Sequence, residues 1–214
     1  MDAPLWQVLT PTIPHRHARL AALLALLDAQ ARPGFGLLLY RDNLVAGVAA
    51  KRQALLDASA AEYVSFIDDD DWVPPYFTYR VLSELGARPD YVGFTVAYTE
   101  DGQPGQPALH SIRYDGWHNW PEHMVRDISH LNPVRREIAA RGRFSGGDSE
   151  DYRWAAQIRE ARVVHEEAWI PEVMYRYQFD SSDCHRTRRK PWSGPLPELP
   201  AYPWLTVLKT PESC

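Results

Sequence analysis

Four consecutive aspartates, Asp68, Asp69, Asp70 and Asp71, form the part of the sequence best suited to chemistry. Adjacent carboxylates repel one another, which raises some of their pKa values unless a cation compensates the charge. Because every ligand atom would be oxygen, Mg²⁺ or Mn²⁺ fits better than zinc, and these ions commonly keep water or phosphate in their other positions. The aspartates therefore predict a divalent cation that holds a diphosphate.

The residues on either side of the aspartates argue against a simple solvated acidic loop. An apolar strand is expected at residues 63–67, directly before them, and the sequence Trp-Val-Pro-Pro follows at residues 72–75. In an open α/β sheet, ligands bind at the carboxyl ends of the strands. The aspartates occupy such an end, so we favour a binding site.

A second acidic group, Asp148, Glu150 and Asp151, lies just before a helix expected at residues 152–162. Acidic side chains suit the positive N-terminal end of a helix, so capping is one explanation. A carboxylate on such a loop can also take a proton from a hydroxyl. A helix N-terminus at an active site can serve both purposes.

The elements that must position these acids alternate along the first half of the chain. Strands are expected at residues 6–9, 36–40 and 63–67, and helices at residues 15–30 and 45–60. In the first helix the leucines fall at helical spacing. Strands that alternate with helices imply parallel βαβ units with right-handed crossovers, and hence a layered α/β sheet.

The second half predicts further helices and an antiparallel extension of the sheet. Helices are expected at residues 76–85, 131–141 and 152–162, and strands at residues 91–98, 108–114, 163–165 and 173–177. In the second of these helices, Pro133 would take an early position, where proline is tolerated. We expect one domain at residues 1–180, followed by a proline-rich extension, residues 181–214, that packs on the domain or is partly mobile.

Bulk composition narrows the partners and the compartment. A formal net charge of −5 argues weakly against a surface devoted to nucleic acid, although residues 185–190 are mostly basic. Cys184 and Cys214 have no metal-site spacing, which indicates a reducing, cytoplasmic setting. No apolar run approaches the length of a membrane span, so none is expected.

With these elements in place, the sequence resembles the family 2 glycosyltransferases of GT-A fold over roughly residues 5–180. Four segments match in order: residues 9–16 after the first strand, Asp42 after the second, residues 50–53 in the next helix, and the strand at residues 63–67 with its aspartates, which looks like the D-x-D segment of that family. The resemblance implies a GT-A type, Rossmann-like α/β/α sandwich with a mixed, mostly parallel central sheet. It also implies a nucleotide-sugar donor, with UDP-sugar expected.

The resemblance assigns a role to several residues. It implies that Pro11, Thr12 and Arg16 line the nucleotide pocket and that Asp42 meets the base or ribose. Lys51 and Arg52 would approach the base or phosphates, and Asp68, with Asp69 beside it, would contact the ribose side. The resemblance further implies that Asp70, Asp71 and His185 face the Mn²⁺ or Mg²⁺ ion. Two roles have simple alternatives. Asp42 could cap the following helix, and Lys51 with Arg52 could form its solvated face.

The resemblance also implies an inverting transfer in which Asp151 acts as the base, with Glu150 and Asp148 as supports or substitutes. Trp117 and His130 would lie on the acceptor side, although a structural histidine and a core or interface tryptophan are the simpler explanations. The acceptor stays open: a glycan, a metabolite, a protein or a hydroxylated DNA base. So does the oligomeric state.

Two other function classes compete with sugar transfer. A nucleotidyltransferase or metal-dependent phosphohydrolase also places aspartates after a strand, but the chain has no glycine-rich phosphate loop. A non-catalytic module that binds a metal or a nucleotide would use the acids without turnover. Donor binding that strengthens with Mn²⁺, followed by transfer, separates sugar transfer from both.

Overall fold

The computed structural model describes residues 3–182 and 190–208. In the first half the elements are β1 (Trp6–Thr12), η1 (Pro14–Arg16), α1 (His17–Asp28), β2 (Phe35–Arg41), α2 (Val48–Ala58), β3 (Tyr63–Phe66), α3 (Phe77–Leu85) and β4 (Tyr91–Glu100). The second half contains β5 (Gln103–Pro104), β6 (Ala108–His110), β7 (His118–Asn119), β8 (Met124–Arg126), β9 (Val134–Arg135), α4 (Arg136–Ala139), α5 (Glu150–Ala161), β10 (Glu167–Phe179) and β11 (Leu205–Leu208).

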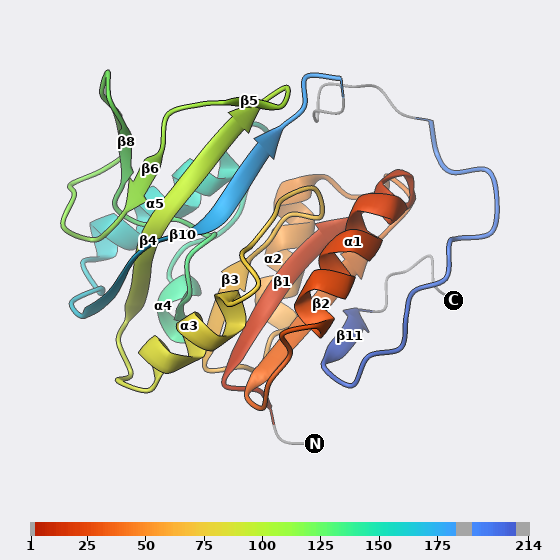
Figure 1. Ribbon diagram of the computed structural model, residues 1–214, viewed down its shortest axis with the longest axis horizontal. Helices are drawn as coiled ribbons and strands as arrows, with labels where there is room; N and C mark the ends of the chain where they lie inside the picture. The colour runs from red at the N-terminus through yellow and green to blue at the C-terminus, as the bar shows by residue number, and fades with distance from the viewer. Residues whose placement is uncertain (1–2, 183–189, 209–214) are drawn as a thin grey trace.

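One mixed sheet joins the strands in the order β11-β2-β1-β3-β9-β4-β6-β8-β7, with β10 and β5 also paired to β4. The four strands at the β11 end are parallel to one another, whereas β9, β4 and β6 pair with antiparallel neighbours. In Figure 1, α1 and α3 lie in front of the sheet and α2 lies behind it. The expected α/β fold with a mixed sheet is confirmed.

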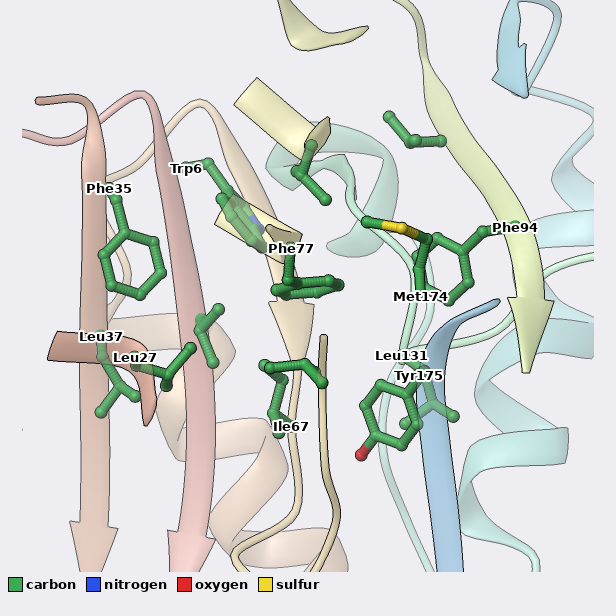
Figure 2. Packing of buried hydrophobic residues seen from close by; sticks show 14 of the residues in the cluster. Trp6, Leu27, Phe35, Leu37, Ile67, Phe77, Phe94, Leu131, Met174 and Tyr175 are labelled. Atoms are coloured by element: carbon green, nitrogen blue, oxygen red, sulfur yellow. The ribbon is translucent and has the colours of Figure 1, made fainter. Parts of the chain in front are cut away.

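Two hydrophobic clusters cover the two faces of the sheet. Alternation along β1 and β2 sends Trp6, Val8 and Leu37 into the cluster under α1 and α3, which Figure 2 shows, and sends Leu9 and Leu38 into the cluster under α2 and α5. Every residue of β1 is buried, as expected for a central parallel strand with helices on both sides. This core fixes the carboxyl ends of β1 and β3 side by side.

Two predicted elements of the second half are wrong. Residues 163–165 form no strand, because the chain there is held as a loop by the Asp90 carboxylate, which accepts hydrogen bonds from the backbone N–H groups of His165 and Glu166. The helix expected from about residue 131 begins only at Arg136. Val134 is instead a strand residue that pairs with both Val64 and Tyr91.

The proline-rich extension contributes a strand that the sequence did not predict. β11 pairs in parallel with β2, and the preceding segment is tied to the domain because Arg41 donates to the Pro197 carbonyl at 2.6 Å. His185, Cys184, Cys214 and the arginines between residues 186 and 189 lie outside the described residues. Within the described part of the chain, no helix is long and apolar enough to cross a membrane.

Candidate active site

A cavity of about 840 Å³ opens at the carboxyl ends of the parallel strands. This volume lies in the range of small-molecule sites. Most of the expected site residues line it, namely Pro11, Thr12, Arg16, Lys51, Arg52, Asp68, Asp69, Asp70, Trp117, His130, Asp148, Glu150 and Asp151. Asp42 and Asp71 are not part of its wall.

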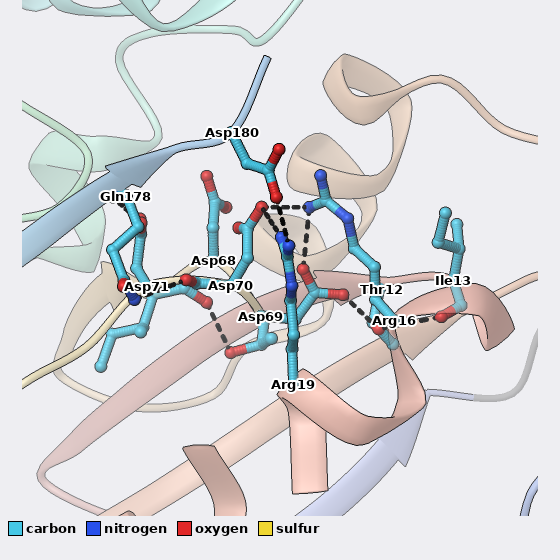
Figure 3. Close-up of polar contacts among 12 residues, drawn as sticks. Thr12, Ile13, Arg16, Arg19, Asp68, Asp69, Asp70, Asp71, Gln178 and Asp180 are labelled. Carbon is cyan, nitrogen blue, oxygen red and sulfur yellow. Dashed lines mark hydrogen bonds and ion pairs between the residues drawn. The ribbon is translucent and has the colours of Figure 1, made fainter. Parts of the chain in front are cut away.

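Asp69 ties the loop after β1 to the acid segment, which is residues 68–71. It is buried, and its carboxylate accepts hydrogen bonds from Thr12 Oγ1 at 2.5 Å and Arg16 Nη1 at 3.0 Å (Figure 3). Burial raises its pKa, and the neighbouring arginine and hydroxyl act against that rise. Since β1 and β3 are parallel neighbours, these contacts hold their two carboxyl-end loops in one fixed arrangement.

Asp70 lines the cavity and lies close to two arginine side chains, Arg16 and Arg19. Its Oδ2 atom lies 2.9 Å from Arg16 Nη1 and 3.6 Å from Arg19 Nη1, and Arg19 also donates to Asp180 at 2.6 Å. Burial and the neighbouring aspartates raise the pKa of Asp70 to about 6, against the effect of Arg16. A carboxylate held at such an elevated pKa gains from a further cation beside it.

Asp71 does not line the cavity, contrary to the expectation that it faces the metal beside Asp70. Its two oxygens accept hydrogen bonds from the Tyr175 hydroxyl at 2.6 Å and the Gln178 backbone N–H at 2.8 Å. Burial raises its pKa well above the usual range. The adjacent Trp72 pairs with Arg176, so Asp71 fastens the acid segment to β10.

Arg52 is a buried cation that joins the acid segment to helix α5. Its Nη2 atom donates to the two oxygens of Asp68 at 3.0 and 2.8 Å, and its Nη1 atom donates to Glu150. Burial acts to lower the pKa of Arg52, but the carboxylates outweigh it and raise that pKa. Because Glu150 is itself buried and paired with this cation, it is suited to position Arg52 rather than to accept a proton.

Replacing Arg52 by methionine is expected to lower the free energy of unfolding by about 3–5 kcal/mol, because two largely buried carboxylates lose their cation. Urea unfolding measures the change. The matched control is Arg80→Met, whose ion pair with Glu84 is more exposed and should cost below about 1 kcal/mol. Adding Glu150→Gln to Arg52→Met should restore part of the loss; equal effects at Arg52 and Arg80 would contradict the bridging role.

Lys51 and Asp42 form a buried pair at the edge of the cavity, which Lys51 lines and Asp42 does not. Lys51 Nζ contacts the Asp42 carboxylate and donates to the Thr12 carbonyl at 3.0 Å. The other Asp42 oxygen accepts from the Ala46 backbone N–H at 2.6 Å, while the cap of α2 is Gly47. Asp42 therefore organises the loop before α2, and neither the expected contact with a base or ribose nor helix capping describes its position.

Asp151, like Asp148, is a carboxylate of the second acidic group that has access to the cavity. Its side chain is 29% exposed, and its Oδ2 atom lies 4.0 Å from His130 Nδ1. His130 is buried, and burial followed by the charge of Arg52 lowers its pKa well below the usual value, so it is neutral. Neither ring nitrogen of His130 has a hydrogen-bond partner among the described residues.

The loop before α5 carries backbone conformations that shape the cavity wall. Gly146 has φ 81°, and Ser149, the residue before α5, adopts the left-handed conformation with φ 65°. Arg153 donates to the Asp148 carbonyl at 2.9 Å and so closes the loop. This turn brings both Asp148 and Asp151 onto the cavity wall.

The cavity lining includes residues that were missed from the sequence, among them Tyr98, Tyr177, His110 and Arg126. Tyr98 and Tyr177 are paired across β4 and β10 with ring centroids 5.0 Å apart, and both lie near the carboxyl ends of parallel strands, a position that signals a site. His110 and Arg126 lie on three-residue strands, β6 and β8, and their sequence neighbourhoods carry no motif. Only the folded arrangement reveals this second pair.

The donor chemistry of the cavity is compatible with a divalent ion shared with a phosphate ligand. Among the described residues, no group of three or more His, Cys, Asp or Glu side chains could hold a metal ion. Asp68 and Asp70 do supply two partly exposed carboxylates that line the cavity. Mg²⁺ and similar ions are commonly held by one or two carboxylates together with substrate phosphates, so the residues present fit such an ion.

The family model described as glycosyl transferase family 2 matches residues 23–143, more than half of the chain. The chain therefore belongs to glycosyl transferase family 2 and is a glycosyltransferase domain. The match includes the acid segment, Arg52 and His130, but it leaves out Thr12 and Asp151. No curated protein matches the chain.

Solved structures of TarS from S. aureus share the fold. The crystal structure of TarS 1-349 with UDP-GlcNAc superposes with a TM-score of 0.62 and 14% identity over 81% of this chain and 58% of that chain. The complex of the same protein with UDP gives a TM-score of 0.63 and 14% identity, covering 81% and 60%. The chain thus spans about three fifths of the length of these TarS chains, and the GT-A fold is confirmed.

Proposed function

We propose that this domain transfers a sugar from a nucleoside-diphosphate sugar, with UDP-sugar favoured, to an acceptor hydroxyl by direct displacement with inversion. One observation carries the proposal: a single cavity is lined both by Asp68 and Asp70 of the acid segment and by Asp151 at the start of α5. Asp68 and Asp70 are suited to bind a metal ion at the diphosphate end of a donor. Asp151 is suited to take the proton of the acceptor hydroxyl. TarS crystals that contain UDP-GlcNAc and UDP support a UDP-sugar.

On the donor side, the end of β1 at Pro11 and Thr12 would form one wall for the nucleoside. Lys51 is held against the Thr12 carbonyl and Arg52 against Asp68, so both cations would order this wall. Arg16 lies 2.9 Å from Asp70 and is only partly buried, so it could turn toward a phosphate. These contacts favour an anionic donor over a neutral sugar.

A Mn²⁺ or Mg²⁺ ion would be held by Asp70, with Asp68 beside it, together with the donor diphosphate. When bound, the ion would neutralise charge on the departing nucleoside diphosphate. His185, which the family likeness also assigns to the metal, lies outside the described residues. Asp71 keeps the acid segment in place from behind, through Tyr175.

In the transfer step, the acceptor oxygen attacks the anomeric carbon while the bond from that carbon to the diphosphate oxygen breaks, and its electron pair leaves with the nucleoside diphosphate. The hydroxyl proton passes to the Asp151 carboxylate. Neutral His130, 4.0 Å from Asp151, would orient that carboxylate or the acceptor. Trp117, which also lines the cavity, would pack against the sugar or acceptor.

The acceptor class stays among a glycan, a metabolite, a protein and a hydroxylated DNA base. The last possibility rests on the basic run near the C-terminus, most of which lies outside the described residues. The cytoplasmic setting likewise stays a prediction. Family membership favours sugar transfer over the phosphoryl chemistry of a nucleotidyltransferase or phosphohydrolase.

A thermal-shift screen of UDP, UDP-sugars and other nucleotide sugars, with and without Mn²⁺, tests the donor proposal. At 100 times its dissociation constant, a specific donor stabilises the fold by about 2.7 kcal/mol. We expect UDP and one UDP-sugar to raise the unfolding temperature, and Mn²⁺ to increase the rise. If no nucleotide diphosphate stabilises the domain under either condition, the proposed function is wrong.

A further inference from the structure

His110 and Arg126 face each other on the paired strands β6 and β8. Both residues are at least nine-tenths buried, with exposed fractions of 1% and 9%, and both line the cavity. Neither has a part in the transfer described above. Two buried polar side chains side by side in a ligand cavity call for partners of matching chemistry.

Arg126 is a buried cation whose described contacts carry no negative charge. Its guanidinium donates to the carbonyls of His118 and Val125 at 3.1 and 2.7 Å and approaches the Met124 sulfur at 3.4 Å. It also stacks over the Trp117 ring at 4.9 Å. No carboxylate within residues 3–182 or 190–208 forms an ion pair with it.

The charges of the other two arginines that line the cavity are each balanced by carboxylates. Arg16 is paired with Asp69 and Asp70, and Arg52 with Asp68 and Glu150. A buried charge without an ionic partner is costly to the fold. Arg126 is therefore suited to bind a negatively charged ligand.

His110 presents a hydrogen-bond acceptor beside this cation. The Asn132 amide nitrogen donates to the Val92 carbonyl, so the Asn132 oxygen faces His110 Nδ1 at 2.7 Å and Nδ1 must carry the hydrogen. Burial lowers the pKa of His110 to about 4, so the ring is neutral and Nε2 is a bare acceptor. Nε2 has no hydrogen-bond partner among the described residues.

The strand order separates this pair from the acid segment, where the donor diphosphate is proposed to bind. Three strands, β9, β4 and β6, lie between β3, which precedes the acid segment, and β8, which carries Arg126. Four strand spacings correspond to about 19 Å along a sheet. The Asp151 charge acts to raise the pKa of both Arg52 and Arg126, so Asp151 lies near both arginines.

We propose that His110 and Arg126 form an acceptor subsite that selects an acceptor carrying a phosphate or carboxylate group close to the hydroxyls. Arg126 would bind the anionic group, and His110 Nε2 would accept a hydrogen bond from an acceptor hydroxyl. Trp117, beneath the guanidinium, would hold Arg126 in place. This inference rests on the proposed function, because it concerns the acceptor side of the same cavity.

Calorimetric titration with glucose 6-phosphate, glucuronate and glucose tests the subsite in the presence of UDP. Wild-type protein should bind one or both anionic probes at least about tenfold more tightly than glucose, and salt should weaken this preference. The phosphate and carboxylate probes show which anion is preferred. Equal binding of all three probes, including no detectable binding of any, would overturn the proposal.

Arg126→Gln should abolish the preference for the anionic probes while leaving UDP affinity unchanged. Arg126→Lys keeps the charge and should retain part of the preference, which covers the case in which the glutamine variant does not fold. The control is Arg32→Gln, an arginine outside the cavity that stacks on Tyr79 at 5.3 Å and should behave as wild type.

Two outcomes separate this inference from the proposed function. If Arg126→Gln weakens UDP binding as much as anion binding, Arg126 belongs to the donor side and the acceptor subsite is wrong. If wild-type protein binds no nucleotide diphosphate but still prefers the anionic probes through Arg126, the proposed function fails while the anion site stands.

Discussion

Asp70→Asn should remove the effect of Mn²⁺ on UDP binding. In wild-type protein, we expect Mn²⁺ to strengthen UDP binding by about 10- to 100-fold, or about 1.4–2.7 kcal/mol, since the ion would bridge Asp70 and the diphosphate. The asparagine keeps the size of the side chain but loses its charge. Calorimetric titration of UDP with and without Mn²⁺ measures the difference for each variant.

Two other aspartates of the chain, Asp57 and Asp71, serve as controls for Asp70. Asp57→Asn alters an exposed acid on α2 and should behave as wild type. Asp71→Asn should lower stability through its contacts with Tyr175 and Gln178, yet keep the Mn²⁺ effect. If wild-type UDP affinity is the same without Mn²⁺, the charge of the diphosphate is met by Arg16 and Arg19, and the metal proposal is wrong.

Asp151→Asn should reduce sugar transfer by about 10²–10⁴-fold and leave donor binding intact. The acceptor proton would lose its base, whereas the donor contacts proposed above involve Asp68 and Asp70 rather than Asp151. Initial rates of UDP release that depend on acceptor give the transfer rate, and thermal shift with UDP reports donor binding. A reference acceptor from the anionic probes, or any acceptor found by screening, serves for the rate.

Glu160→Gln, an exposed acid on the same helix, is the matched control for Asp151 and should keep full transfer. Asp148→Asn tests the neighbouring candidate on the cavity wall. If Asp151→Asn keeps full activity and Asp148→Asn loses transfer, Asp148 is the base and the assignment of Asp151 is wrong. Loss of both donor binding and transfer in Asp151→Asn would show that Asp151 positions the donor instead.

The first half of the fold could be predicted because local and tertiary signals agree there. The apolar runs at β1, β2 and β3 are buried on both faces, and the leucine spacing of α1 matches the face that packs on the sheet. Strand β11 could not be predicted, because its short sequence follows many prolines and its pairing depends on the exposed edge of β2. Its partner lies about 170 residues earlier in the sequence.

The candidate site was predicted in outline, but not in the direction of each side chain. The sequence indicates that the acid segment follows a strand, yet a run of four aspartates does not reveal that Asp71 turns to Tyr175 while Asp70 faces Arg16. The buried pairing of Lys51 with Asp42 is likewise set by packing. His110 and Arg126 meet through strand pairing between segments that have no motif of their own.

The pairing of β11 with β2 has a practical consequence for shortened versions of the chain. Without residues 190–208, the apolar strand Phe35–Arg41 would present a row of unpaired backbone N–H and C=O groups to solvent. Such an unprotected sheet edge is a template for pairing with other chains and for aggregation. A shortened chain that ends soon after the catalytic residues would therefore be smaller but prone to self-association.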